Sequence, residues 1–253
     1  MLGGQTPSNA IRTGPAVGSV FAEELEMSKK QVFFGSIGMN FVGSGCAQIG
    51  IVGGGSMVVG SGKSVVQART VQGDFNLLEV TGSAEIEVRR ADCCTVEVQG
   101  EDNLVDFLET KLIGSTLHVG IKRGVSFTSH LPLKVVATAP SITDVDLSGS
   151  GDVMLAGLEQ AELRVELNGS GDVVADGTVA SVSLTLHGSG DIDTRRLKAR
   201  KANIKLHGSG DIRAFAKEEA KVRLHGSGDV VVKGCPTIRD ARVSGSGDID
   251  FDE

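Results

Sequence analysis

The sequence of 253 residues contains no tryptophan and no tyrosine, and aromatic residues make up only 4% of it. A core built from this chain must therefore be aliphatic, and a glycan-binding surface that stacks sugar rings on aromatic side chains is disfavoured. Proline is also scarce, with 5 residues against 35 glycines. Many glycines with few prolines indicate tight turns between short strands rather than a disordered linker.

No apolar run reaches the roughly 18–20 residues that a membrane helix requires, so no transmembrane helix is predicted. The net charge of −7 argues against nucleic acid as a partner, because nucleic-acid binding needs a basic face. One basic run is present and is interpreted as a solvated loop or edge; it consists of Arg195, Arg196, Lys198, Arg200 and Lys201.

The four cysteines form no recognisable framework. Cys93 and Cys94 are adjacent, while Cys46 and Cys235 stand alone, and none belongs to a C-x-x-C pair. This spacing matches neither a zinc site nor a set of disulfides.

The first 64 residues lack the regularity of the remainder. Residues 1–34 are expected to be loosely structured or to hold a targeting region, and the glycine-rich residues 35–64 to form a β lead-in or a cap. If translation begins at Met27, two lysines followed by the apolar stretch 32–45 are typical of an export signal. Otherwise the chain begins without a clean signal at Met1, and a cytoplasmic location is the alternative.

The clearest feature of the sequence is a repeated tetrapeptide, Gly-Ser-Gly-Asp. Its copies follow one another at steps of 20, 19, 20, 18 and 19 residues. Around each copy, apolar and polar residues alternate with period two, which is the pattern of a strand with one buried face. The six copies end at Asp152, Asp172, Asp191, Asp211, Asp229 and Asp248.

This repeat predicts an all-β fold: a single-stranded parallel β-helix, or solenoid, with about 19 residues per coil, preceded by less regular β-strands. The solenoid domain is expected to span residues 65–253, with the six repeats beginning at about residue 141. A sandwich of antiparallel hairpins is the rival fold. It explains the alternation but not the recurrence of identical residues at identical offsets.

The residue types of the tetrapeptide are those of a turn. Glycine permits a positive φ or a close backbone approach, and a turn carboxylate can accept hydrogen bonds from backbone N–H groups. In a stack of coils the Ser and Asp side chains point outward in parallel files, which makes them the candidate binding residues. Besides the six aspartates, this exposed ladder contains Ser150, Ser170, Ser189, Ser209, Ser227 and Ser246.

A third file contains three of the five histidines, and a metal site there is considered. His187, His207 and His225 precede consecutive copies of the turn. Imidazoles beside carboxylates can bind a divalent cation, but a linear file seldom converges on one ion. An exposed polar ladder is the preferred interpretation, and no metal and no cofactor are expected. A cation bound by the aspartates, as in calcium-binding nonapeptide repeats, is the alternative, although here the Asp follows Gly directly and occurs once per coil.

The segments DLSGSGDV, ELNGSGDVV, TLHGSGDID and RVSGSGDID closely resemble the bacterial head GIN domain, a family described as the head of an autotransporter adhesin. The resemblance extends upstream, where residues 69–121 are similar to the opening of that domain and include a strand expected at Thr116–Ile121. It implies a mainly β stack at the cell envelope or surface. It implies no catalytic residues.

No unique constellation of acid, base or nucleophile interrupts the repeats, so the chain is not predicted to be an enzyme. We expect an adhesin-like module that presents its Ser/Asp/His face to an envelope or extracellular protein or to a matrix. The alternative is a structural scaffold, inside the cell or in the envelope, that self-assembles through stacked β edges. Homo-oligomers through the faces or ends of the solenoid are compatible with both.

Overall fold

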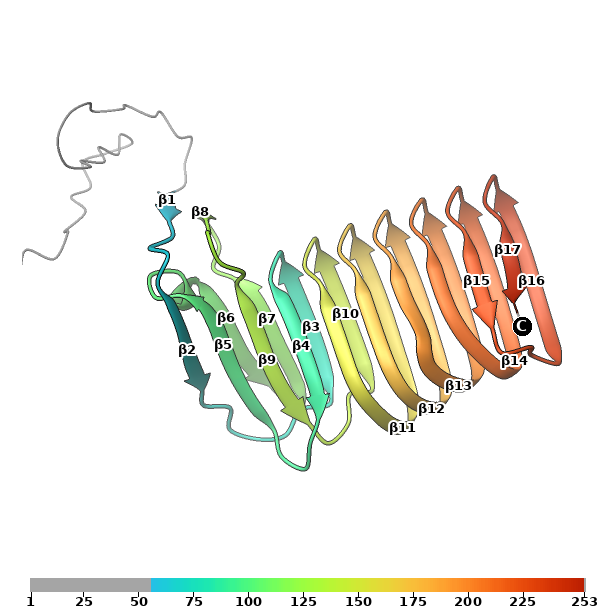
Figure 1. Ribbon diagram of the computed structural model, residues 1–253, viewed down its shortest axis with the longest axis horizontal. Helices are drawn as coiled ribbons and strands as arrows, with labels where there is room; N and C mark the ends of the chain where they lie inside the picture. The colour runs from blue at the N-terminus through green and yellow to red at the C-terminus, as the bar shows by residue number, and fades with distance from the viewer. Residues whose placement is uncertain (1–55, 253) are drawn as a thin grey trace, which may run out of the picture. The chain divides into compact units, whose positions relative to one another are not determined.

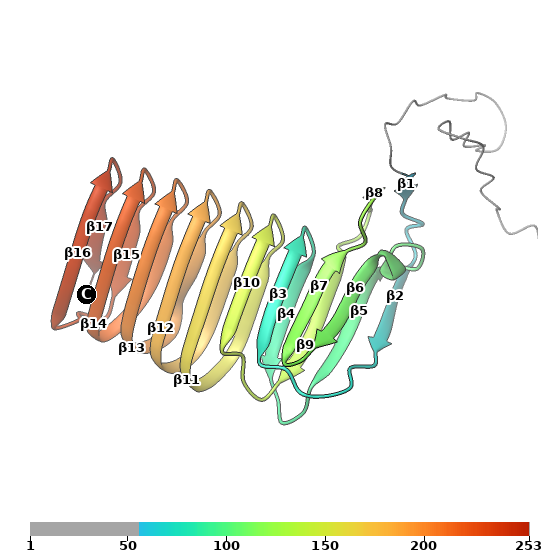
Figure 2. The same ribbon diagram turned by 180° about the vertical axis from the view of Figure 1, so that it is seen from behind.

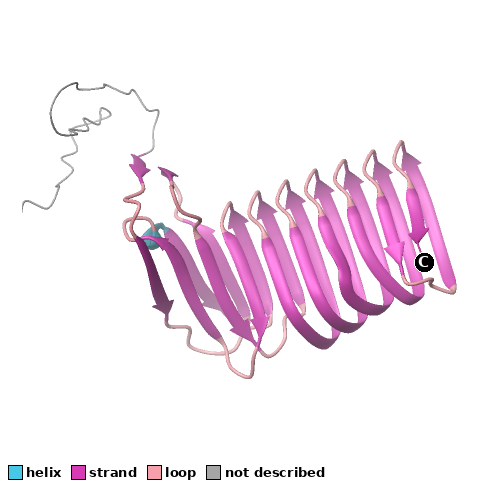
Figure 3. Cartoon of the chain, viewed as in Figure 1, coloured by secondary structure: helices cyan, strands magenta, loops and turns pink. Residues whose placement is uncertain are grey.

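A computed structural model describes residues 56–252 of the chain, and these are almost entirely β-strand (Figure 3). A single turn of 3-10 helix, η1 (Val105–Phe107), interrupts the strands. The predictions made for residues 1–34, for most of 35–64 and for a start at Met27 lie outside the described residues. Within the described part, no helix is long and apolar enough to cross a membrane.

The C-terminal part is the predicted solenoid (Figure 1). Its strands pair only in parallel, and equivalent residues of successive coils are partners, such as Leu147 with Leu167 and Leu184 with Ile204. The sandwich of antiparallel hairpins is therefore wrong for this region. The strands are β10 (Asp144–Gly149), β11 (Val153–Gly169), β12 (Val173–Gly188), β13 (Ile192–Gly208), β14 (Ile212–Gly226), β15 (Val230–Lys233), β16 (Ile238–Gly245) and β17 (Ile249–Asp252).

Each long strand runs from one Gly-Ser-Gly-Asp turn to the next and so belongs to two successive coils. After a Gly-Ser-Gly-Asp turn the chain runs along one wall of the solenoid, bends at the opposite edge and returns along the other wall to the next turn. The returning segments, called the ascending legs, are 144–149, 162–169, 181–188, 201–208, 219–226 and 238–245. In Figures 1 and 2 the turns form a row along one edge and the bends lie along the other.

The core consists of aliphatic ladders, as the composition requires. The column five residues before each Asp is fully buried from Leu147 to Leu224, and the column two residues earlier is equally buried from Val145 to Val222. A β-strand presents alternate side chains to opposite faces, so the residues between these columns point to solvent. The basic run that begins at Arg195 is exposed as predicted, but it lies in β13 rather than in a loop.

The solenoid begins one coil earlier than the six repeats indicate. Strands β3 (Leu77–Gly82) and β4 (Glu85–Arg90) form a coil that pairs in parallel with β10 and β11. The turn between them is Gly82-Ser83-Ala84-Glu85, and Gly82 is the partner of Gly149. This is a seventh, degenerate copy of the tetrapeptide.

Antiparallel strands close the N-terminal side of the stack. Strands β7 (Thr116–Ile121) and β9 (Lys134–Ala139) pair in parallel with β3 and β4, and β7 has the bounds that the sequence predicted. The outermost pairs include β6 on β7, β5 on β9 and β2 on β5, all antiparallel, and β1 on β8. Their bounds are β1 (Ser56–Val59), β2 (Ser64–Arg69), β5 (Thr95–Glu101), β6 (Leu108–Ile113) and β8 (Val125–Thr128).

Candidate binding surface along the repeated turns

The six turns stack on one another through their backbones. The Ser170 N–H donates to the carbonyl of Gly149 at 2.9 Å, and the Val173 N–H donates to the carbonyl of Asp191 at 2.9 Å. Equivalent bonds join each pair of neighbouring turns from Gly149 to Asp248. The turns are therefore a continuous hydrogen-bonded edge rather than six independent loops.

Close stacking explains both glycines of the tetrapeptide. Gly169 has a φ of +151°, and a Cβ at this position would lie 2.0 Å from the carbonyl oxygen of Gly149. A Cβ on Gly171 would lie 1.9 Å from the carbonyl oxygen of Gly151. Both contacts are with backbone atoms of the preceding coil, which the stacking holds in place, so no side chain can be accommodated at either position.

The aspartates form a ladder of side-chain to backbone bonds. Each of the first five carboxylates accepts the backbone N–H of the aspartate in the next coil, as in the 3.0 Å bond from the Asp191 N–H to Asp172 Oδ1. The same bond is present at the other four steps from Asp152 to Asp248, at 2.9–3.1 Å. Arg213 adds bonds to Asp191 and Asp211, which offset part of the repulsion between neighbouring carboxylates.

Within residues 56–252, the serine side chains make no comparable bonds, although the serine backbone N–H groups take part in the stacking. All six are exposed, and in the described part of the chain their hydroxyls make no hydrogen bond with another protein group. We call them the serine file: Ser150, Ser170, Ser189, Ser209, Ser227 and Ser246. Their hydroxyls are free to donate and accept hydrogen bonds at the exposed edge.

The three histidines also form a file, and their rings stack. The ring centroids of His187 and His207 are 4.9 Å apart with planes inclined by 15°, and His207 and His225 are 4.9 Å apart at 11°. Partial burial lowers the pKa of His207, and the adjacent His187, His225 and Lys205 lower this pKa further. Stacked rings do not aim their nitrogens at a common point, and residues 56–252 hold no cluster of three or more His, Cys, Asp and Glu suited to a metal.

Sequence reasoning missed a buried carboxylate in the N-terminal part. Glu101 is fully buried at the end of β5, and its Oε1 accepts the N–H groups of His130 and Leu131 at 2.8 and 3.1 Å. It holds the loop after β8 in place. The other isolated histidine, His118, pairs with Glu79 at 3.1 Å, and no local sequence signal connects these partners.

The comparisons with known proteins agree with this architecture. A family model described as "Putative auto-transporter adhesin, head GIN domain" matches residues 74–236. A putative adhesin from Bacteroides fragilis NCTC 9343 superposes with a TM-score of 0.65 at 23% identity, covering 77% of this chain and 99% of its own. None of the curated proteins matches the sequence.

Two further solved structures share the fold. A putative lipid binding protein from Parabacteroides distasonis ATCC 8503 has a TM-score of 0.55 at 20% identity and covers 78% of this chain and 99% of its own. A putative adhesin from Parabacteroides merdae ATCC 43184 has a TM-score of 0.54 at 19% identity, with 77% and 98% covered. At these identities the likeness concerns the fold alone.

Proposed function

The chain belongs to the head GIN domain family of putative auto-transporter adhesins, and from this premise we propose that it is a non-enzymatic, adhesin-like module of the cell envelope or surface. Its partner is an envelope or extracellular protein or a matrix, and the repeated turns present the contacting face. The proposal requires no cofactor. The family and the solved structures described above are named for adhesion or lipid binding, not for catalysis.

The observation that carries the proposal is the contrast between the serine file and its neighbours. Stacking requires the glycines, and each of the first five aspartates accepts a ladder bond, but within residues 56–252 no hydrogen bond involves a hydroxyl of the serine file. A residue type that recurs at every turn without a role in the fold is best explained by what it contacts outside the fold. Regularly spaced hydroxyls, with carboxylates and imidazoles beside them, suit a partner with many polar groups.

Protease digestion of intact cells tests the location. A tag placed after Glu253 is expected to be digested without lysis, because an adhesin-like module must face the outside. Protection of the tag until the cytoplasm is opened would overturn this part of the proposal. The tag on a cytoplasmic protein of the same cells serves as the control.

Alanine substitutions test the contacting face. The triple substitution Ser189→Ala, Ser209→Ala and Ser227→Ala is expected to reduce retention of cells on coated surfaces at least tenfold. The coatings are fibronectin, collagen and envelope purified from the same bacterium. The exposed Thr178 lies near the opposite edge, so Thr178→Ala is the matched control and should leave retention unchanged. Equal retention of the triple variant and the native protein on a surface that retains the native protein would rule out the serine file as the contacting face.

A second candidate function, a self-assembling scaffold, is favoured by one observation at the C-terminal coil. Ile238 and Val243 of β16 are 58% and 49% exposed, whereas the equivalents of Val243 in earlier coils are buried. Open β edges can pair with further chains. Sedimentation at increasing concentration tests this candidate: assembly through the end predicts larger species that Val243→Asp abolishes. A monomer at all concentrations would contradict it.

A further inference from the structure

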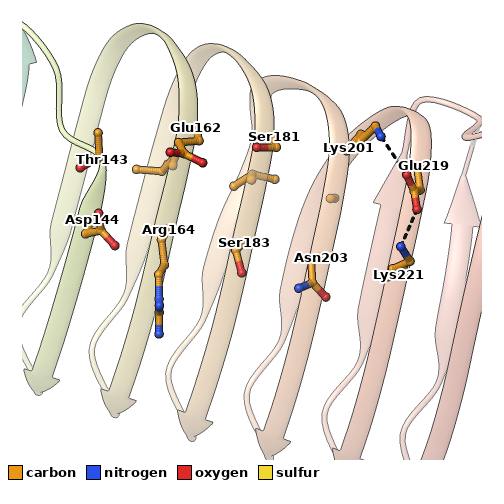
Figure 4. A pocket seen from close by; sticks show the side chains of 13 residues that line it. Thr143, Asp144, Glu162, Arg164, Ser181, Ser183, Lys201, Asn203, Glu219 and Lys221 are labelled. Atoms are coloured by element: carbon orange, nitrogen blue, oxygen red, sulfur yellow. Dashed lines mark ion pairs between the residues drawn. The ribbon is translucent and has the colours of Figure 1, made fainter.

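A groove of about 550 Å³ crosses the outer surface of the ascending legs, away from the turns (Figure 4). Its floor is formed by the short side chains of Ser181 and Ser183 on β12, with Asn203 on β13 beside them. Longer side chains stand on either side, with Glu162 and Arg164 on β11 and the charged residues of β13 and β14 opposite. The groove exists because one strand carries small residues between strands that carry large ones.

The floor offers unused hydrogen-bonding groups. Within the described residues, neither the hydroxyls of Ser181 and Ser183 nor the amide of Asn203 bonds to another protein group. A hydroxyl and a carboxamide can each both donate and accept. The floor can therefore pair with the N–H and C=O groups of a peptide backbone.

The side of the groove toward the N-terminus is acidic. Of the residues that line the groove on this side, Asp144 and Glu162 are acidic and Arg164 is basic. Two more carboxylates occupy outward positions of β10 and β11 beyond the lining, which gives these two ascending legs a net of three negative charges. Three of the four acids, Asp144, Asp146 and Glu162, make no ion pair with any residue in 56–252. The five charged residues are Asp144, Asp146, Glu162, Glu166 and Arg164.

The side toward the C-terminus is basic. Of the residues that line the groove on this side, Lys201 and Lys221 are basic and Glu219 is acidic. The outward positions beyond the lining, on the ascending legs of β13, β14 and β16, add three cations and one carboxylate, which gives these legs a net of three positive charges. Glu219 lies 3.3 Å from Lys201 and 2.7 Å from Lys221 and so holds both ammonium groups at the wall of the groove. The seven charged residues are Lys201, Lys205, Lys221, Arg223, Arg242, Glu219 and Asp240.

We propose that this groove binds a short zwitterionic peptide, with its amino group over the acidic side and its carboxylate over the basic side. The stacked histidines show a coil spacing of 4.9 Å. Glu162 and Lys201 are two coils apart, so their backbones are separated by about 10 Å, which is the length of roughly three extended residues. The site lies on a different surface from the serine file and goes beyond the proposed adhesion.

Titration of the full chain with trialanine, followed by ligand-observed NMR, tests the proposal. Trialanine with free termini is expected to bind at least tenfold more tightly than N-acetyl-trialanine amide, because only the former carries both charges. Equal affinity of the two peptides, or no binding of either, would overturn the proposal. High salt is expected to weaken the binding of trialanine but not that of the capped peptide.

Substitutions locate the site. Lys201→Gln combined with Lys221→Gln is expected to weaken the binding of trialanine about tenfold. Lys217 is an exposed lysine of β14 outside the groove, so Lys217→Gln should have no effect. Ser183→Leu fills the floor and should abolish binding, and Ser183→Thr should retain it. An equal loss in Lys217→Gln would show that binding is not in the groove.

The two charged halves would also complement a second copy related by a two-fold axis through β12. In that case the molecular mass would double with concentration, the double lysine variant would prevent the doubling, and trialanine would not bind. This outcome would overturn the proposal, because a second chain and not a peptide would occupy the groove.

Discussion

Within one tetrapeptide, three residue types have different physical roles. The glycines are required because a Cβ at Gly171 would lie 1.9 Å from a backbone oxygen of the preceding coil. The aspartate is required because its carboxylate accepts the N–H of the next aspartate. The hydroxyl of the serine makes no hydrogen bond within residues 56–252, so the serine is the residue to which the proposed contact with a partner is assigned.

Removal of one rung of the aspartate ladder measures its contribution. Asp172→Ala leaves the Asp191 N–H without its acceptor and is expected to lower the free energy of unfolding by about 1–2 kcal/mol. Asp172→Asn keeps an acceptor oxygen and should cost less. Asp248 accepts no such bond within the described residues, so Asp248→Ala is the control in urea denaturation. Equal losses for Asp172→Ala and Asp248→Ala would contradict the role of the ladder.

Glycine substitutions separate the cost of a clash from that of a strained backbone. Gly171→Ala is expected to destabilise the protein by about 3 kcal/mol, because the added methyl group meets backbone that cannot move without unstacking the coils. Gly157 has a φ of +71° but open space around it, so Gly157→Ala should cost only about 1–2 kcal/mol. Thermal or urea unfolding of the two variants compares the two costs. A larger loss of stability in Gly157→Ala than in Gly171→Ala would refute the packing argument.

The histidine file gives the protein a predictable response to acid. The pKa of His207 is lowered in the fold, so the unfolded chain binds the proton more readily. Stability from this source is constant at high pH and falls as the pH drops through about 6.5, the ordinary value for histidine. Between pH 7.5 and 5.5 the native protein should lose more stability than His207→Gln does. His130→Gln, which alters an exposed histidine outside the file, should behave like the native protein.

At the scale of the element, the repeats could be read from the sequence but the first coil could not. Ala84 and Glu85 replace the second glycine and the aspartate, and an insertion carrying β5 to β9 separates this turn from the next. The structure shows why alanine is tolerated here: within residues 56–252 this turn begins the row, and no earlier turn of the row is stacked against it. A Cβ at Gly82 would accordingly meet only the side chain of Ile121, at 3.5 Å.

Position along the stack determines how much a core residue contributes. Leu186 is completely buried, and Leu186→Ala is expected to cost about 2–5 kcal/mol through lost contacts and a residual cavity. Val243 occupies the same column in the last coil but is 49% exposed, so Val243→Ala should cost less than about 1 kcal/mol. Urea denaturation of the two variants provides the comparison. Similar losses would show that the last coil is as tightly packed as the middle of the stack.

At the scale of the whole molecule, the sequence predicted the files but not the groove. Residues at one offset from the repeated Asp were expected to align, and Ser148, Asn168, His187 and His207 do so in the register of the strands. The separation of charge into an acidic and a basic half was hidden, because each strand contributes only two or three outward charges. These charges become two opposed surfaces only when residues about 19 apart are placed side by side.

A solenoid in which each coil contacts its neighbours should tolerate shortening from its end. A chain that stops after Lys233 lacks β16 and β17 and leaves β14 and β15 as the last strands. We expect it to keep the β-rich circular dichroism spectrum, with a lower free energy of unfolding but a sharp transition. Loss of the spectrum would show that the last coil is essential for the remainder to fold.

The aspartate ladder also has a direction, and this bears on how the chain is made. In every rung the carboxylate belongs to the earlier coil and the N–H to the later one. During synthesis, a finished coil thus already displays the acceptor that the coil still leaving the ribosome will need. We therefore expect each turn to act as a template for its successor, so that the stack can grow in the order of translation without waiting for its C-terminus.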